Sequence, residues 1–443
     1  MFNFFASVTL VIFSIIPNVA MAFEVYGPYA ITLKDYQGQE TNSVNYSEQI
    51  SQHLLHSSLK KAISSGASLE VMNRYFNGAE EELLILDPIS SDGFIFDGKD
   101  INKIAKTNLS GMVYKDIIPG WLGGMTAKEV LSSMIEKAAQ SKNGYDPIHG
   151  YDYAQLVSKF TMGAVFYHQA CGNHLNKMLD ADYKPNNAPY KSGAHYTGKE
   201  HSWDQAFGYW GAAAHGATLS AVQNYNIAKQ KNEVFADFNL DGVVNLMSEM
   251  NYAYAYYASS FDKSGLTDYY NLITKAYIEG RQIITEANGN LLSEDTRSEL
   301  EEKAWIICSN WELVISEAIF RYAGIIYTDL ENLTANRGDK KAYREYVKHW
   351  GELKGFALSL HTGGRSLGEL GTRIDNIIGL GPVVGRVFPA EIAENSVQVT
   401  GVNSDGSFVL SDASADGYMV NMLKLQKLLQ EEFEIMAKNN NKL

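Results

Sequence analysis

The sequence predicts a mainly α-helical protein, built as a multi-helix bundle with long loops and minor β hairpins near the termini. Apolar residues recur at helical spacing from Tyr46 onward, and several of these segments end at a glycine, as helices commonly do. A hydrophobic content of 45% over 443 residues is enough to bury a large core. No repeat of fixed period indicates a solenoid.

Residues 1–22 have the pattern of a secretory signal peptide. An apolar run over residues 8–16 precedes Pro17 and the small-x-small sequence at residues 20–22, although no Lys or Arg stands before the run. We expect cleavage after Ala22 and a periplasmic or secreted mature chain. No later apolar run is long enough to span a bilayer.

The mature chain divides into four segments by pattern. Residues 23–45 are expected to be extended, and residues 46–378 to form the helical domain. The clearest helices are expected at 46–66, 68–78, 126–144, 154–179, 266–289, 293–333 and 339–363. Residues 379–417 are irregular and β-like, with "SVQVTG" and "SFVLS" as candidate hairpin strands. Residues 418–443 are expected to contribute a C-terminal helix that packs on the helical domain.

Charge and cysteine content limit the function classes. The formal net charge is −14, so the basic footprint that nucleic-acid binding requires is missing, whereas cation binding is compatible with this acidity. The two cysteines, Cys171 and Cys308, both lie in helical apolar patterns. In an oxidising compartment they either pair or remain two buried thiols, and the sequence leaves both alternatives open.

The stretch "TGKEHSWDQAFGYWG" begins a helix, because Thr197 and Glu200 have the spacing of a capping box. Its aromatic side chains fall on one face, which we assign to the core. His201 and Asp204 fall on the other face. They are either solvent-exposed or part of a ligand site.

A second histidine–carboxylate pair lies downstream in "KHWGELKGF". His349 and Glu352 are three residues apart on a helix and therefore share a face. If the two helices face each other, His201, Asp204, His349 and Glu352 would converge. Such a set suits a transition metal such as zinc or iron, or a histidine–carboxylate acid–base pair.

The clearest ion signal is "ADFNLDGVVNLMSEM". Oxygen-bearing side chains occupy positions 1, 3, 5 and 9 of a calcium loop, and a glycine occupies position 6. Position 12 is a serine, and the acid comes one residue later. A helix is expected to begin near Leu246, and an ion-free Asx turn is the alternative. The expected calcium ligands are Asp237, Asn239, Asp241, Val243 (through its carbonyl oxygen), Asn245 and Glu249.

Two further motifs are interpreted as having a structural role only. "DASADGYMVN" at residues 412–421 resembles the calcium loop only in part and is interpreted as a turn. His174 follows Cys171 on an apolar stripe and is interpreted as a hydrogen-bonded core histidine.

Five segments, taken in order, resemble the bacterial envelope family called domain of unknown function 4856. They are "LVSKFTMGAVFYHQACGNHL", "EHSWDQAFGYWG", "DFNLDGVVNLMSEMNYAYA", "YIEGRQII" and "HWGELKGFALSL". The resemblance covers the chain from about Tyr46 to the last helix. His349 and Glu352 are also similar to the His-x-x-Glu motif of imelysin-like proteins, which implies a related helical bundle and a link to iron uptake. Asp204 departs from that motif.

Together these observations predict an exported helical protein that binds a metal ion or a metal-bearing small ligand and holds structural calcium. The alternative is a metal-dependent hydrolase, acting on peptides or glycans, that uses the same two histidine–carboxylate pairs. A third hypothesis is a surface interaction module without a small ligand.

Overall fold

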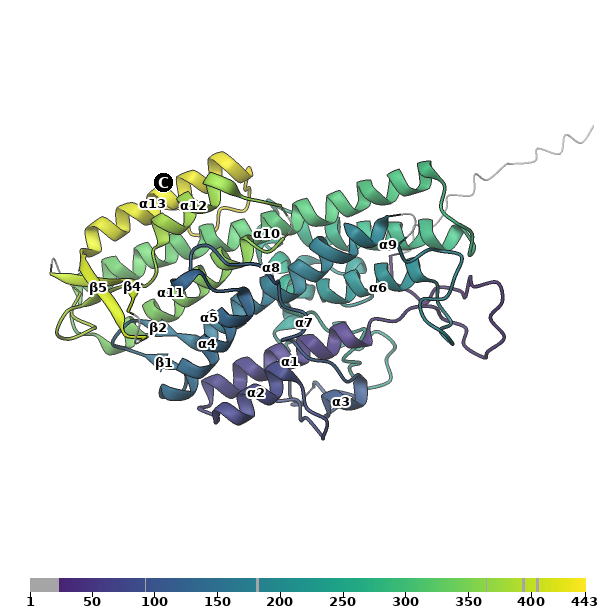
Figure 1. Ribbon diagram of the computed structural model, residues 1–443, viewed down its shortest axis with the longest axis horizontal. Coiled ribbons are helices and arrows are strands. Elements are labelled where there is room, and N and C mark those ends of the chain that lie inside the picture. Colours follow the sequence, from purple (N-terminus) through teal and green to yellow (C-terminus); the bar gives the residue numbers. More distant parts are fainter. Residues whose placement is uncertain (1–23, 92, 181–182, 364, 393–394, 404–405) are drawn as a thin grey trace, which may run out of the picture.

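A computed structural model describes residues 24–443, apart from residues 92, 181–182, 364, 393–394 and 404–405. The signal-peptide prediction therefore lies outside the described residues. The mainly α-helical class is confirmed: the described chain contains helices α1 to α13 and two small antiparallel sheets (Figure 1). None of its described helices combines the length and apolarity needed to cross a bilayer.

Six of the seven clearest expected helices are present with ends close to the expected ones, and further helices join them. Their bounds are α1 Ser47–Ser64, α2 Leu69–Asn77, α3 Ile101–Ile104, α4 Ala127–Gln140, α5 Tyr153–Thr161, α6 Gly198–Trp210, α7 Ala221–Ala228, α8 Ala253–Asp262, α9 Tyr269–Glu286, α10 Glu294–Ala335, α11 Lys340–Leu360, α12 Gly368–Ile378 and α13 Ala415–Phe433. Short 3-10 turns lie at Leu122–Gly124, Lys177–Leu179, Gly216–Thr218 and Glu233–Phe235.

Helix α10 is the longest of the described helices and packs against several others. It has 42 residues and is therefore about 63 Å long at 1.5 Å per residue. Helices α9, α11 and α13 pack along it, so it joins the two ends of the molecule (Figure 1). The C-terminal helix α13 contacts α10 and α12.

One expected helix differs in its geometry. The segment predicted as a single regular helix over residues 154–179 is α5 followed by a π-helix, Met162–His174. The π-helix comes very close to α11, because a Cβ atom added at Gly163 would lie 2.2 Å from Cβ of Ser359. A 3.6-residue apolar pattern does not distinguish such a widened helix from an α-helix.

The strands are confined to two places. β1 (Tyr145–Asp146) pairs with β2 (Tyr151–Asp152), and β3 (Val383–Gly385), β4 (Ser396–Val402) and β5 (Phe408–Ala413) form an antiparallel sheet in that order. The predicted pairing of "SVQVTG" with "SFVLS" is confirmed. In the described part of the N-terminal extended segment, residues 24–45, no strand forms. The interpretation of residues 412–421 as a turn is wrong, because α13 begins there with Ser414 as its cap.

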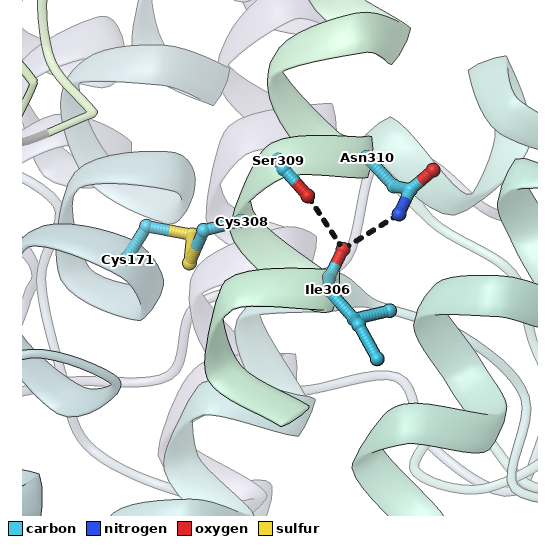
Figure 2. The surroundings of a disulfide bond; sticks show 5 residues. All are labelled: Cys171, Ile306, Cys308, Ser309 and Asn310. Atoms are coloured by element: carbon cyan, nitrogen blue, oxygen red, sulfur yellow. Dashed lines mark hydrogen bonds between the residues drawn. A yellow bond between two sulfur atoms is a disulfide. The ribbon is translucent and has the colours of Figure 1, made fainter. Parts of the chain in front are cut away.

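A disulfide bond joins Cys171 to Cys308, with the two Cα atoms 5.7 Å apart. Cys171 belongs to the π-helix and Cys308 to α10, which lie side by side at this point (Figure 2). The bond therefore decides between the two alternatives that the sequence left open.

Candidate functional site

Helix α6, which carries His201 and Asp204, is buried on every face. The predicted capping box is present: Thr197 Oγ1 accepts from the amide of Glu200, and the Glu200 carboxylate accepts from the amide of Thr197. The alternative of a solvent-exposed polar face is wrong. Asp204 on that face contacts the N-terminal segment and α9, and both of these lie far from α6 in the sequence.

Asp204 is held by three buried donors. Tyr26 Oη donates to Oδ1 at 2.7 Å, Arg281 Nε donates to the same oxygen at 2.9 Å, and the amide of Asn45 donates to Oδ2 at 3.1 Å. Burial raises the pKa of Asp204, and the positive charge of Arg281 opposes that rise. All three polar contacts satisfy a carboxylate that is inaccessible to solvent.

Arg281 is the centre of this arrangement, which we call the Arg281 cluster. Its guanidinium is fully buried and also lies 3.4 Å from Glu200 Oε1. It donates to Ser43 Oγ and Thr285 Oγ1, and it stacks over the ring of Tyr29 at 4.7 Å. Two carboxylates and one guanidinium thus fasten the extended N-terminal segment to α6 and α9. Such a buried, hydrogen-bonded group of opposite charges is structural in character.

Sequence reasoning missed Arg281, although a signal was present. It is a lone arginine in the apolar pattern of "YIEGRQII", directly after Gly280. A Cβ atom at Gly280 would lie 2.0 Å from the ring of Trp203. The segments "EHSWDQAFGYWG" and "YIEGRQII" therefore meet where α6 crosses α9.

His201 packs against two tyrosine rings. Its ring lies between Tyr190 and Tyr196, with centroids 4.3 and 4.4 Å away. Burial lowers the pKa of His201 to about 3, so the imidazole is neutral at physiological pH. His174 is confirmed as a buried core histidine, bonded to Ser202 Oγ at 3.3 Å.

His349 and Glu352 have different partners again. His349 Nδ1 lies 2.7 Å from Asp329 Oδ2, and Glu352 Oε1 lies 3.8 Å from Lys159 Nζ. The π-helix packs against both α6 and α11 and lies between them. The structure therefore does not bring the four residues together. Over the described chain, no group of three or more His, Cys, Asp or Glu side chains is placed to hold a metal ion.

Acid sensitivity is the testable consequence of the buried histidines. Burial lowers the pKa of His53 and His201 to about 3 and that of His174 to about 4, against about 6.5 in an unfolded chain. Below pH 6.5 the unfolded state binds protons that the folded state does not, so stability falls as pH falls. Each histidine contributes up to about 1.4 kcal/mol per pH unit.

We expect His201→Gln to flatten this dependence by about one proton. Denaturant unfolding at pH 7.5, 6, 5.5 and 5 measures the slope, and pH 7.5 is the reference because histidine is neutral there in both states. A variant slope equal to the wild-type slope would show that His201 does not titrate as its burial indicates.

The acidic loop, residues 237–249, closes on itself through side-chain oxygens. Asp237 accepts from the amides of Asp241 at 3.1 Å and Gly242 at 2.9 Å. Asn239 Oδ1 accepts from the amide of Asp241 at 3.0 Å, and Asp241 Oδ1 accepts from that of Val243 at 2.8 Å. Gly242 has a φ of 84°, which fits the position that the sequence assigned to the turn glycine.

Glu249 reaches back into the loop. Its Oε1 accepts from the amide of Phe238 at 3.0 Å and its Oε2 from that of Asn245 at 2.7 Å. Burial raises the pKa of Glu249, and these amides oppose the rise. The expected helix near Leu246 is wrong. Asn245 Oδ1 instead accepts from the amides of Met247 and Ser248 and closes a turn, and the following helix, α8, begins at Ala253.

The acidic loop also contacts a segment that the motif does not contain. Asp97 Oδ2 accepts from Asn245 Nδ2 at 2.8 Å, and Asp97 Oδ1 accepts from the amide of Leu246 at 3.0 Å. Val244 forms an isolated parallel bridge with Phe96. Asp97 has no local sequence signal, because only the fold places it beside the loop.

Comparison with known proteins yields one family. The model of the family described as Domain of unknown function (DUF4856) matches residues 30–288. The match begins before Tyr46 and ends before α10, so it is shorter than the resemblance predicted and does not include "HWGELKGFALSL". No curated protein and no solved structure matches the chain significantly, and the similarity to imelysin-like proteins stays a prediction. The matched region contains Arg281, its two carboxylate partners and the acidic loop, and it spans more than half of the chain, which therefore belongs to the Domain of unknown function (DUF4856) family.

Proposed function

We propose that the protein is an exported helical binding protein whose acidic loop holds a structural calcium ion. The observation that carries the proposal is the closed geometry of the loop. Asp237, Asn239 and Asp241 already turn their side-chain oxygens toward the loop amides, around a left-handed Gly242. Carboxylate and amide oxygens at alternate positions are the donors that calcium prefers.

Two further features support an ion in this loop. Leu240 has a φ of 60°, a left-handed conformation that costs a non-glycine residue about 1–2 kcal/mol. A bound cation would offset this cost and the mutual repulsion of Asp237 and Asp241. Glu249 fits the role of a clamp on the loop amides, since both of its carboxylate oxygens already accept from them.

The contacts of the acidic loop indicate what the ion would do. Because Asn245 and Leu246 bind Asp97, ordering of the loop also orders the segment before α3. Calcium would then act on stability rather than on a reaction. The disulfide between Cys171 and Cys308 supports the export part of the proposal, since such bonds form in oxidising compartments.

Calcium is expected to raise the free energy of unfolding of chelated protein, and Asp241→Ala to abolish the rise. At a hundredfold excess over the dissociation constant the gain is about 2.7 kcal/mol. Denaturant unfolding with calcium, with magnesium and with chelator measures it.

Asp416→Ala is the matched control. Asp416 is an exposed acid in the partial copy of the motif, which the structure places in the first turn of α13. We expect this variant to keep the full calcium response. If calcium fails to stabilise the wild type, the acidic loop is an Asx turn without an ion.

A further inference from the structure

A pocket of about 180 Å³ lies beside the start of α8, and none of the predicted metal ligands lines it. Five segments form its wall: α1, the loop at residues 87–88, α5 with the first residue of the π-helix, the end of α7, and residues 250–257 at the start of α8. Lys60, Lys159 and Lys229 all line it. Three lysines in one small pocket are unexpected in a chain whose net charge is −14. We call it the lysine pocket.

Lys159 is the least solvated of the three cations. It is 5% exposed, and its closest carboxylate oxygen, Glu352 Oε1, lies 3.8 Å away, beyond hydrogen-bonding distance. Lys60 and the rings of Tyr257 and Phe356 are further neighbours, and the two ring centroids lie 5.2 and 5.9 Å from Nζ. Within the described chain, the ammonium group therefore has no oxygen acceptor at hydrogen-bonding distance. A buried ammonium in this condition is costly unless a ligand supplies the acceptor.

The start of α8 adds backbone donors to the same pocket. Tyr252 and Ala253 line it, and α8 extends for 10 residues from Ala253 without any side-chain cap at Tyr252. The first-turn amides of a helix carry partial positive charge and bind anions. Ala253 also has a φ of 37°, which is unusual for a residue with a side chain. The backbone is thus held in a strained conformation where the helix meets the pocket.

The carboxylates near the lysine pocket do not balance the charge of its three lysines. Asp87 stands at the exposed rim, and Glu352 lies behind Lys159, so the pocket has three cations against two carboxylates. His56 does not add charge, because its Nε2 is 3.0 Å from both the carbonyl oxygen and Oγ of Ser158, and burial holds its pKa well below the usual value. The half-buried Ser57 hydroxyl is a further donor in the wall.

We propose that the lysine pocket binds a small phosphate-bearing anion, either inorganic phosphate or a phosphomonoester. Three ammonium groups and an uncapped helix N-terminus surround a volume suited to a group with several acceptor oxygens and a charge near −2. A monocarboxylate has only two oxygens and one charge, and would leave donors unfilled. The ring of Tyr256, 4.6 Å from Lys229 Nζ, offers an apolar surface to an organic substituent.

Phosphate binding is expected to be coupled to protonation of Lys159. Burial and the neighbouring Lys60 hold the pKa of Lys159 well below its usual value, and Glu352 opposes them. A bound dianion would favour the ammonium form and so bind more tightly to the fully protonated site. Phosphate binding in the lysine pocket is independent of calcium binding in the acidic loop, and it is measured on chelated protein.

Isothermal titration at constant ionic strength tests the proposal, with sodium phosphate, glycerol 3-phosphate and sodium acetate as probes. We expect saturable phosphate binding, and a roughly tenfold weaker affinity in Lys159→Met, Lys60→Gln and Lys229→Gln, as loss of one charge-assisted hydrogen bond predicts. Lys60 is half-buried and Lys229 exposed, so these two variants keep the test valid if Lys159→Met does not fold. Lys427→Gln, on the outer face of α13 with a 70% exposed side chain, is the control and is expected to bind like the wild type.

The three probes separate the sources of the anion. Tighter binding of glycerol 3-phosphate indicates a phosphomonoester, and tighter binding of inorganic phosphate indicates the free ion. Both outcomes support the site. Absence of saturable binding, equal binding of acetate, or equal affinities in the pocket variants and Lys427→Gln would overturn it.

Discussion

Replacing Arg281 with methionine is expected to lower the free energy of unfolding by about 3–5 kcal/mol, because it leaves two buried carboxylates without their cation. Asp204 and Glu200 are both completely buried. Asp204 would keep Tyr26 and the amide of Asn45 as donors, but not the charge that opposes the rise in its pKa. Part of the loss would be relieved by protonation of Asp204, so the variant should be relatively less impaired at pH 5 than at pH 8.

Denaturant unfolding of Arg281→Met beside Arg337→Met measures this effect. Arg337 is exposed after the end of α10 and serves as the matched control, with an expected change within about 0.5 kcal/mol. The triple variant Arg281→Met, Asp204→Asn, Glu200→Gln removes the charges as well and should recover part of the loss. A loss below about 1 kcal/mol in Arg281→Met would show that the cluster does not stabilise the packing of the N-terminal segment on α6 and α9.

The extended N-terminal segment should be the first part to respond. Tyr26, Thr32 and Ser43 reach α6 or Arg281 through single hydrogen bonds, at 2.7, 2.9 and 2.6 Å. Without the guanidinium, Ser43 loses its donor, and the carboxylates that bind Tyr26 and Thr32 lose their shared cation. Limited proteolysis would then cut within residues 24–45 earlier in Arg281→Met than in the wild type.

The helices were predictable because their signals are local. Apolar spacing placed the starts of α1, α2, α4 and α10 within one residue of where the structure has them. The failures came where the backbone leaves the regular period. The π-helix has the same apolar stripe as an α-helix, and the turn at Asn245 is decided by one side-chain oxygen.

The sites were less predictable because their partners are distant in the sequence. Asp204 was predicted as a possible metal or ligand residue, but its partners in the structure are Arg281, 77 residues later, and Tyr26, 178 residues earlier. A repeated His-x-x-acid pattern suggested that α6 and α11 face each other, but the π-helix lies between them. Glu352 faces Lys159 instead, and Lys159 lines a pocket that is assembled from five segments without a motif.

The disulfide closes a sequence separation of 137 residues, and its removal should be the other large effect on stability. Chain entropy for a loop of that length corresponds to about 5 kcal/mol, and removal of native disulfides commonly costs 2–5 kcal/mol. The bond also joins the region matched by the family, which ends at residue 288, to α10 beyond it. The double variant Cys171→Ala, Cys308→Ala is therefore expected to lose about 3–5 kcal/mol without losing its helices.

Reduction of the wild type provides the matched comparison. Unfolding in the presence of a strong reductant should lower wild-type stability toward that of the double variant, and the reductant should leave the double variant unchanged. Circular dichroism should show equal helix content in both proteins, because the bond acts mainly by constraining the unfolded chain. Thiol titration of the unfolded, unreduced wild type should detect no free thiol. Two free thiols in that titration would contradict the disulfide, and the support that it lends to an exported protein would be withdrawn with it.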